Sequence, residues 1–377
     1  MSNAQQNKTV LIVANSSWNV VNFRMGLIRA LQAEEFQVVV AAPLDIDPAN
    51  IKALGCEVFE VKVRAQSLNP LRDLGFVLQL FLILRQTGAQ TCLFFTAKPN
   101  IFGGFCASLM GLHYINNISG LGSVFIENGF LSKVMILLYK LALKKSSCVF
   151  FQNRDDLDLF LQKNIVKSEQ TKLLPGSGVN LQKFQPAVNI KKIDQEPFTF
   201  ILISRLIKDK GVIEYIEAAK LVSKLHSDIQ FKILGFLGVQ NPTAISTQQM
   251  NEWQQLQFVS YLGEANDVRP FIEESDCVVL PSYREGTPKV LLEAAAMGKP
   301  IITTDVPGCR EVVEDQLTGF LCEVRSAQDL AHKMCQMIEL SAEQRAQMGR
   351  LGRIKMENQF SEKIVIDRYL EVIRSLK

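Results

Sequence analysis

Two glutamates eight residues apart, Glu285 and Glu293, lie where a short apolar run gives way to an alanine-rich one. Cys277–Leu280 predicts a buried strand, and Val290–Met297 predicts a buried helix. Ligands of parallel α/β sheets bind at the carboxyl ends of strands. We therefore expect Glu285 in a loop over a ligand and Glu293 on the helix below it. The alternative is that both acids are ordinary solvated or satisfied side chains.

The turn between the two acids has a helix-start pattern. Thr287 precedes Pro288, which predicts Thr as the cap and Pro as the first helical residue. Free backbone amides at a helix start attract anions. Gly286, Thr287, Pro288 and Lys289 are therefore candidates for holding a phosphorylated ligand.

A second cationic loop joins a predicted strand, Phe198–Ser204, to a predicted helix, Val212–Leu225. It contains Arg205 and Lys210, whose charges suit a diphosphate, while Asp209 partly offsets them. Two further predicted strand ends carry Gly235, where a nucleoside could approach the backbone closely, and Leu262.

Candidate residues for a second substrate lie in the N-terminal half. Asn22 and Arg24 lie on the first predicted helix, and Lys98 lies at a strand-to-helix junction. A glycine-rich stretch with aromatic residues adds Ser119, Gly120 and Glu127, and it resembles a binding loop more than a tight turn. Solvated surface positions are the alternative for Asn22, Arg24 and Lys98.

Two acidic pairs are possible metal ligands. Asp45 and Asp47 follow a strand, as ligands of a divalent cation on a nucleotide diphosphate would. Pro48 comes directly after Asp47, so Asp47 is better interpreted as the cap of the next helix. The acids of Asp156-Leu157-Asp158 lie on diverging sides of a predicted helix. We therefore predict no metal.

The predicted helix Leu131–Lys145 is basic and amphipathic. Lys133, Lys140 and Lys144 fall on one stripe, and no acid occurs between Lys133 and Lys145. Such helices bind anionic membrane surfaces. The alternative is an ordinary crossing helix whose apolar face belongs to the core.

Composition limits the remaining classes. The 377 residues are 47% hydrophobic and 21% charged, which indicates a globular protein of two domains. No apolar run is long enough to span a membrane, and eight scattered cysteines fit a reduced, cytoplasmic protein. Residues 1–175 hold 17 Lys and Arg against 12 Asp and Glu, or +5, and the rest carry −2. This mild asymmetry suits a phosphate or membrane partner and is too weak for nucleic acid.

Strand and helix patterns alternate along both halves, which predicts an α/β fold with parallel sheets. In the first half we expect a strand at Thr9–Ala14, a loop at 15–19 and a helix at Val20–Gln32. A later helix is expected at Asn100–Met110. We predict an N-terminal Rossmann-like domain at 1–175, a linker at 176–197 and a second Rossmann-like domain at 198–355. Residues 356–377 should form a helix that packs back on the first domain.

The pattern Glu-Gly-x-Pro-x-x-x-x-Glu-Ala, with Pro281-Ser282 before it and Gly298-Lys299-Pro300-Ile301 after it, resembles the signature of the family 4 retaining glycosyltransferases. The resemblance implies the GT-B fold, two Rossmann-like domains facing across a cleft. It implies that Arg205 and Lys210 bind the diphosphate of a UDP-sugar donor. It also implies that Glu285 contacts the transferred sugar and Glu293 the donor ribose.

The N-terminal half resembles a narrower group, which extends sugars linked to undecaprenyl diphosphate. The resemblance is carried by Ser67–Pro70, Gly120–Ser123 and Gly129-Phe130. It implies a lipid-linked saccharide acceptor and a peripheral location on the inner face of the cytoplasmic membrane. Ala97-Lys98 replaces a histidine that many relatives carry, and His113, His226 and His332 are interpreted as structural. A sugar-nucleotide epimerase, a non-catalytic nucleotide-sugar binder and a transferase with a soluble acceptor remain as alternatives.

Overall fold

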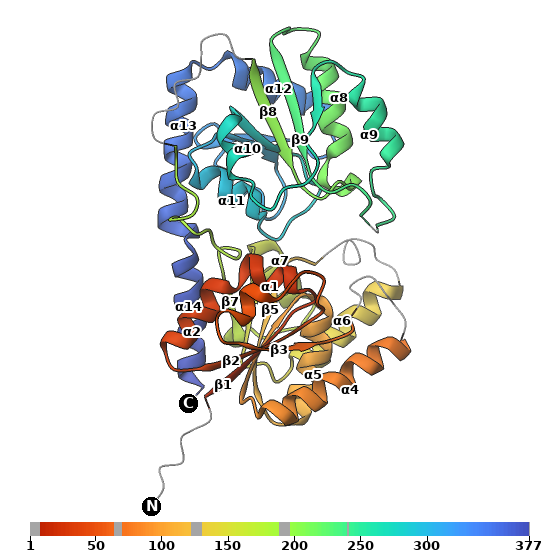
Figure 1. Ribbon diagram of the computed structural model, residues 1–377, viewed down its shortest axis with the longest axis vertical. Coiled ribbons are helices and arrows are strands. Elements are labelled where there is room, and N and C mark those ends of the chain that lie inside the picture. Colours follow the sequence, from red (N-terminus) through yellow and green to blue (C-terminus); the bar gives the residue numbers. More distant parts are fainter. Residues whose placement is uncertain (1–7, 64–69, 122–129, 188–196, 240, 377) are drawn as a thin grey trace, which may run out of the picture. The chain divides into compact units, whose positions relative to one another are not determined.

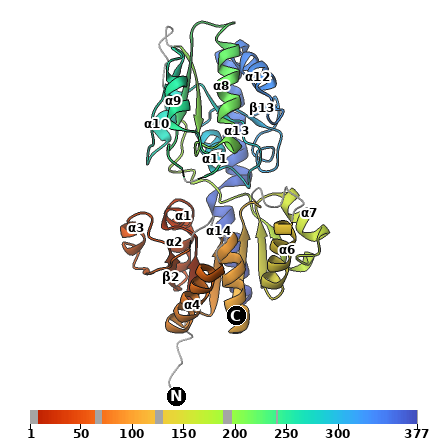
Figure 2. The same ribbon diagram turned by 90° about the vertical axis from the view of Figure 1, so that its right-hand side faces the viewer.

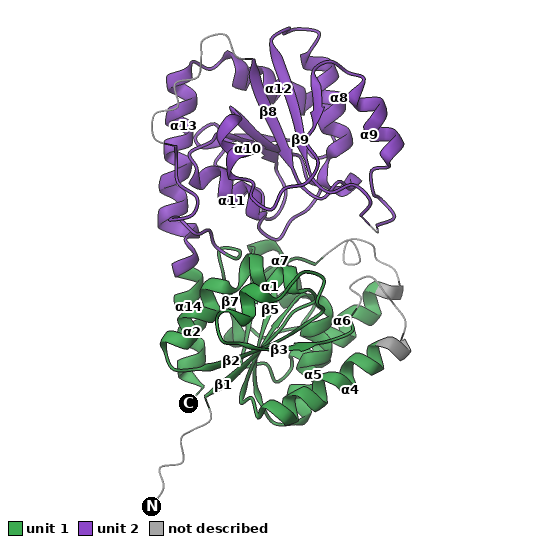
Figure 3. Ribbon diagram, in the orientation of Figure 1, with its two compact units in different colours: residues 1–177, 364–377 green, residues 178–363 purple. Residues whose placement is uncertain are grey.

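A computed structural model describes residues 8–63, 70–121, 130–187, 197–239 and 241–376. The chain divides into two units, residues 1–177 with 364–377 and residues 178–363 (Figure 3). Each unit is a parallel β-sheet with helices on both faces (Figure 1). The predicted α/β class is confirmed.

The first unit has the strand order β3-β2-β1-β4-β5-β6-β7. Its strands are β1 Thr9–Val13, β2 Gln37–Ala42, β3 Glu57–Glu60, β4 Thr91–Phe95, β5 His113–Ile118, β6 Cys148–Phe151 and β7 Thr171–Leu173. All residues of β1 and β4 are buried, because helices cover both faces of the sheet. The strand order reverses between β1 and β4, and such switch points are where open α/β sheets bind ligands.

The helices of the first unit form two layers. On one face lie α1 Ser17–Phe23, α2 Met25–Ala33, α3 Ala49–Lys52 and α14 Glu362–Ser375. On the other lie α4 Pro70–Thr87, the π-helical η1 Pro99–Gly103, α5 Gly104–Leu109, α6 Phe130–Leu143 and α7 Arg154–Gln162. A short 3₁₀ helix, η3 Ser168–Gln170, precedes β7. The C-terminal helix α14 thus completes the core of this unit, with Tyr369 buried against Phe95 and Phe150.

Two helices of this unit differ from expectation. The helix predicted at Val20–Gln32 begins earlier, at Ser17, because the Ser16 side chain caps it by accepting the amide of Asn19. It is interrupted at Arg24, which separates α1 from α2. The helix predicted at Asn100–Met110 opens with the π-helical turn of η1.

The second unit has the strand order β10-β9-β8-β11-β12-β13. Its strands are β8 Phe198–Ile203, β9 Ile229–Leu234, β10 Val259–Tyr261, β11 Cys277–Leu280, β12 Ile301–Thr304 and β13 Gly319–Cys322. Its helices are η4 Lys208–Lys210, α8 Val212–Val222, α9 Thr247–Gln254, α10 Arg269–Glu274, α11 Lys289–Ala296, α12 Ala327–Glu339, α13 Ala342–Lys355 and η5 Met356–Phe360. Within the segment expected to be a linker, Val179 pairs with Ser361 and Phe184 is buried, so this part is packed into the unit.

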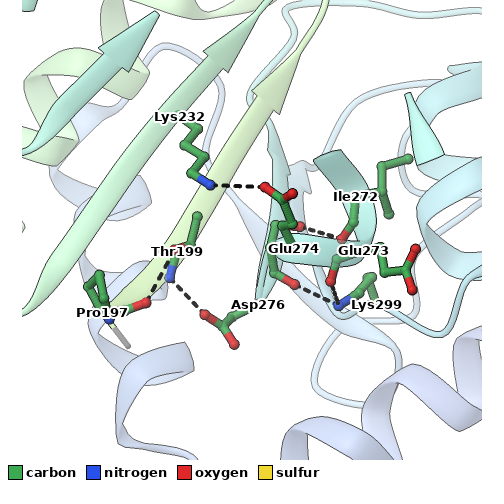
Figure 4. Close-up of polar contacts among 9 residues, drawn as sticks. Pro197, Thr199, Lys232, Ile272, Glu273, Glu274, Asp276 and Lys299 are labelled. Carbon is green, nitrogen blue, oxygen red and sulfur yellow. Dashed lines mark hydrogen bonds and ion pairs between the residues drawn. The ribbon is translucent and has the colours of Figure 1, made fainter. Parts of the chain in front are cut away.

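Hydrogen bonds between charged side chains and the backbone connect the starts of β8 and β11 with the end of α10 (Figure 4). The backbone N–H of Thr199 donates to the Asp276 carboxylate at 2.7 Å. The Lys299 ammonium donates to two carbonyls at the end of α10, those of Glu273 and Ser275, at 2.7 Å each. Lys299, part of the family-like pattern, is therefore used here as a helix cap. The amino edge of this sheet is tied by internal contacts, and the candidate site lies at the opposite edge.

Candidate functional site

Glu285 and Lys210 meet at the carboxyl edge of the second sheet. Lys210 follows β8 and Glu285 follows β11, and these two strands are neighbours. The Lys210 ammonium forms an ion pair with the Glu285 carboxylate, and both side chains are largely buried. The hydroxyl of the buried Ser282 donates to the same carboxylate oxygen at 2.7 Å. Glu285 is thus fixed by two partners before any ligand is considered.

Close backbone contacts hold the Glu285 loop in place. The Thr304 hydroxyl donates to the Ser282 carbonyl, and the Glu285 amide donates to the Pro307 carbonyl at 3.3 Å. Gly308 has φ +84°, and an added Cβ there would lie 2.2 Å from the Gly286 carbonyl oxygen. Gly211 has φ +72°, and its Cβ would lie 2.1 Å from the Pro281 carbonyl oxygen. Both positions therefore require glycine.

Glu293 lies buried on α11, as its position in the pattern predicted. Lys289 Nζ lies 3.4 Å from a Glu293 carboxylate oxygen, one helical turn earlier. Burial raises the pKa of Glu293, and the charges of Lys289 and Lys183 oppose this effect. An acid kept buried at this cost is a candidate for a binding role.

The helix start is displaced by one residue from its predicted place. Helix α11 begins at Lys289, and Pro288 lies at the N-cap with an extended ψ of 117°. Proline fixes φ but leaves ψ free, so Pro288 does not have to enter the helix. The assignment of Thr287 as cap and Pro288 as first helical residue is therefore wrong.

Arg205, Gly235 and Leu262 line the same carboxyl edge. The Arg205 side chain is exposed, and no ion pair to it occurs in the described part of the chain. An added Cβ on Gly235 would lie 2.0 Å from the Ser204 carbonyl oxygen, so close backbone approach explains this glycine. The amides of Gly235 and Leu262 donate to the carbonyls of Gly263 and Ile233 at 2.7 and 2.8 Å.

Three residues of this site, Ser282, Tyr283 and Glu214, were not proposed as candidates from the sequence. The Tyr283 hydroxyl donates to the Glu214 carboxylate at 2.6 Å and ties the Glu285 loop to α8. Burial and the nearby Glu214 raise the pKa of Tyr283, so its hydroxyl stays protonated and able to donate. Arg325 stacks over the Tyr283 ring at 4.6 Å. No spacing rule links Glu214 to Tyr283, because they come from distant parts of the chain.

In the first unit, Lys98 lines a cavity at the carboxyl edge of the sheet. Lys98 Nζ lies 2.5 Å from an Asp73 carboxylate oxygen, and both side chains are mostly buried. The cavity has a volume of about 510 Å³, and its other lining residues are Pro43, Glu60, Val61, Lys62, Val63, Gly75, Phe76 and Gln79. Its size is that of a small-molecule site. Because acids balance the lysines, it suits an uncharged polar ligand with an apolar face.

The other N-terminal candidates are placed differently. The Asn22 amide donates to the Trp18 carbonyl at 3.0 Å. Arg24 is buried, with its guanidinium 3.9 Å from the centre of the Phe95 ring, so it faces the interior. Ser119 and Gly120 follow β5 at the carboxyl edge and are accessible. Glu127 lies outside the described residues.

Asp45 and Asp47, two of the possible metal ligands, accept hydrogen bonds from nearby backbone amides. The Asp45 carboxylate accepts the Ser17 amide at 2.6 Å and the Ser17 hydroxyl at 2.8 Å. The Asp47 carboxylate accepts the Ala49 amide at 3.0 Å at the start of α3. Across the described ranges, no three His, Cys, Asp or Glu side chains gather as a metal site would require.

Helix α6 divides its residues between core and surface. Tyr139, Ala142 and Leu143 are buried, so most of the apolar side belongs to the core. The three lysines of the predicted stripe, Lys133, Lys140 and Lys144, are exposed. Of the helices that the described ranges contain, none is both long and apolar enough to cross a bilayer.

Sequence comparisons cover both halves of the chain. Residues 9–153 match the family described as glycosyl transferase 4-like, and residues 184–355 match glycosyl transferases group 1. The chain is 29% identical over 376 residues to the N,N'-diacetylbacillosaminyl-diphospho-undecaprenol alpha-1,3-N-acetylgalactosaminyltransferase of Campylobacter jejuni, covering 96% of each chain. It is 27% identical over 281 residues to the UDP-Gal:alpha-D-GlcNAc-diphosphoundecaprenol alpha-1,3-galactosyltransferase of Escherichia coli, covering 71% of this chain and 70% of the relative.

Solved structures share the fold at low identity. Sucrose-phosphate synthase from Thermosynechococcus elongatus superposes with a TM-score of 0.79 at 17% identity, covering 98% of each chain. Anabaena HepE in complex with UDP and glucose superposes with a TM-score of 0.76 at 18% identity, covering 97% of this chain and 99% of that one.

Proposed function

Because the chain belongs to the glycosyltransferases, 4-like in its N-terminal half and group 1 in its C-terminal half, we propose that it moves a sugar from a UDP-sugar to a saccharide on undecaprenyl diphosphate. The names of the Campylobacter jejuni and Escherichia coli relatives support this acceptor class. Residues 198–355 bind the donor and residues 1–175 the acceptor. The transferred sugar is a hexose or N-acetylhexosamine, and its anomeric configuration is retained.

The observation that carries the proposal is the contact of Lys210 and Ser282 with Glu285 at the carboxyl edge of the second sheet. Glu285 holds the transferred sugar, and Lys210 beside it binds the diphosphate together with Arg205. As the bond from the anomeric carbon to the diphosphate oxygen breaks, both cations stabilise the charge that develops on UDP. The acceptor hydroxyl forms the new bond on the same face, and its proton passes to the leaving phosphate oxygen.

The remaining donor contacts come from α11 and the neighbouring strand ends. The Glu293 carboxylate accepts hydrogen bonds from hydroxyls of the donor ribose. The phosphates meet the helix start, which is formed by Gly286, Thr287, Pro288 and Lys289. Gly235 and Leu262 offer backbone to the nucleoside. Each good charge-assisted contact is worth roughly 1.5–3 kcal/mol.

For the acceptor, we place its saccharide against Lys98 and the cavity beside Asp73. Asn22, Ser119, Gly120 and Glu127 complete the acceptor side. The buried Arg24 acts mainly by holding the start of α2 against Phe95.

The test is UDP release measured with a panel of UDP-sugars, with and without lipid-diphosphate-linked N-acetylhexosamine acceptors, followed by NMR of the product linkage. We expect release that depends on the acceptor and a product with the anomeric configuration of the donor. Interconversion of UDP-sugars without an acceptor would instead indicate an epimerase. UDP-sugar binding without turnover under every condition would indicate a non-catalytic binder.

Transfer is expected to continue in excess EDTA. The charge of the diphosphate is met by Arg205, Lys210 and the start of α11, and the carboxylates of Asp45 and Asp47 are engaged by backbone amides. The measurement is turnover before and after chelation, with an added-metal control. Loss of activity in EDTA and its recovery with magnesium or manganese would contradict this prediction and would make Asp45 and Asp47 candidate metal ligands at the donor site.

We also expect the N-terminal unit to dock on an anionic bilayer at the inner face of the cytoplasmic membrane through the lysines of α6. Each lysine contributes about 1 kcal/mol near such a surface. The variant Lys133→Glu, Lys140→Glu, Lys144→Glu should therefore lose most co-sedimentation with anionic liposomes at low salt. The matched control reverses three exposed lysines elsewhere, Lys52, Lys167 and Lys224. Equal sedimentation of both variants and the wild type would contradict this role for α6.

A further inference from the structure

Helix α4 carries a stripe of exposed leucines. Leu74, Leu78 and Leu82 are 55%, 58% and 65% exposed. Residues spaced by four lie on one helix face, and this face is opposite the buried Phe76 and Leu80. Single exposed leucines are ordinary, whereas three on one helix face form an apolar patch that calls for a partner.

The helices beside α4 cover the same face of the sheet. Leu11 and Val13 of β1 pair in register with Cys92 and Phe94 of β4, and this face of the sheet packs against α4 and α5. The register carries the same face on to Ile118 and Phe151, which pack against α6. The three helices therefore form one layer (Figures 1 and 2).

Exposed leucines recur on the other two helices of this layer. Leu109 at the end of α5 is 81% exposed, and Leu137 and Leu141 of α6 are 56% and 50% exposed. We name as the leucine face Leu74, Leu78, Leu82, Leu109, Leu137 and Leu141.

The same helices expose positive charge. Lys133, Lys140, Lys144 and Lys145 are exposed on and just after α6, and Arg85 is exposed near the end of α4. Among the described residues of α4, η1, α5 and α6, the only acid is Asp73, and its charge is met by Lys98. Exposed leucines and exposed cations on one helix layer complement a bilayer that carries anionic headgroups.

We infer that the leucine face inserts into the headgroup boundary of an anionic bilayer, with α4 supplying the apolar anchor and α6 the charge. The inference rests on the proposed function, because the proposed acceptor is linked to a lipid. It differs from docking by α6 alone, because Tyr139, Ala142 and Leu143 of α6 are buried in the core and Met135, Ile136 and Leu138 are partly buried against it. A second copy of the chain is the weaker occupant, since a two-fold contact would bring the lysines of two copies together.

Insertion would also place the acceptor cavity. Leu74 directly follows Asp73, which lines the cavity with Lys98 at the carboxyl edge of the sheet. The cavity therefore borders the first half of α4, where the leucine stripe begins. A saccharide in the cavity could keep its lipid in the bilayer beside the leucines.

The test compares the full-length variant Leu74→Gln, Leu78→Gln, Leu82→Gln with the wild type on vesicles of phosphatidylcholine containing about 30% phosphatidylglycerol. Glutamine keeps helix propensity and removes the apolar surface. A matched control, Leu221→Gln, Leu225→Gln, Leu317→Gln, removes three exposed leucines of the second unit. We expect the partition coefficient of the α4 variant to fall roughly 10-fold or more. The control should bind as the wild type does.

Salt separates the contributions of the two helices. Binding that remains in the α4 variant should vanish at high salt, because exposed charges are screened beyond ~10 Å at 0.1 M. A Leu78→Trp variant gives a second readout that does not depend on loss of function. Its added emission should shift to the blue on vesicles, and that of Leu225→Trp should not shift.

Three results would overturn the inference. In the first, the α4 variant partitions onto vesicles as the wild type does. In the second, the emission of Leu78→Trp does not shift. In the third, the wild type is a dimer and the α4 variant is a monomer. The last would assign the leucine face to a second copy. Transfer to a short-chain, water-soluble acceptor should be equal in the wild type and the α4 variant. If the wild type transfers to no acceptor at all, the proposed function fails while vesicle insertion is judged separately.

Discussion

Replacing Arg205 or Lys210 by alanine is expected to lower turnover ~100-fold or more, by analogy with the loss of one donor to a developing anion. Both cations lie at the carboxyl edge of the second sheet, Lys210 in contact with Glu285 and Arg205 exposed in the same loop after β8. Their positive charge is needed most when the bond to UDP breaks. The loss should therefore appear mainly in kcat rather than in KM for the donor.

Lys208→Ala is the matched control, since Lys208 is an exposed lysine of the same short helix, two residues from Lys210. It should keep near-normal turnover. Thermal melting shows whether each variant is folded, and in Lys210→Ala the Ser282 hydroxyl still holds Glu285. Near-normal turnover in both Arg205→Ala and Lys210→Ala would remove the diphosphate role from this loop.

Glu293→Gln is expected to weaken binding of the UDP-sugar donor and to leave the fold at least as stable as that of the wild type at pH 7. Loss of a charged partner for the ribose hydroxyls should raise KM for the UDP-sugar about 10- to 100-fold. Burial raises the pKa of Glu293 above its ordinary value of 4.5, so the folded protein binds this proton more tightly than the unfolded chain. Stability from this group therefore falls as pH rises from 4.5 through the raised pKa. Glutamine removes that cost at neutral pH.

The measurement is the melting temperature of wild type and Glu293→Gln from pH 4 to 8, alongside donor kinetics at pH 7. The difference between the two melting curves should grow in favour of the variant as pH rises. Glu339→Gln, which changes an exposed acid of α12, serves as the control and should shift neither quantity. A variant that melts lower at pH 7 and keeps the wild-type donor KM would make Glu293 a structural acid.

The α/β class could be predicted because it follows from local patterns of apolar residues. Runs such as Cys277–Leu280 are apolar throughout, as strands buried on both faces must be, and β11 occupies that range. The helix after it follows from its alanine-rich run, although its first residue does not. Pro288 fixes only one of its two backbone angles, so the pattern Thr-Pro allows a start at either Pro288 or Lys289.

Contacts between distant segments were decided only by the tertiary structure. The sequence placed Lys210 and Glu285 at the same edge of the sheet but did not predict their ion pair. It predicted neither the hydrogen bond from Ser282 to Glu285 nor the one from Tyr283 to Glu214. Gly308 is required because the Gly286 carbonyl lies against it, and no local pattern shows that approach.

The same limit explains the surface of the first unit. Hydropathy marks Leu74, Leu78 and Leu82 as apolar just as it marks Phe76 and Leu80, and both sets recur at helical spacing. The sheet covers one side of α4 only, so Phe76 and Leu80 enter the core and the three leucines remain exposed. On α6 the packed core buries Tyr139, Ala142 and Leu143. From the sequence alone, the apolar side of this helix was equally compatible with a membrane surface. Hydrophobicity is a property of each residue, whereas burial depends on which other segments pack against it.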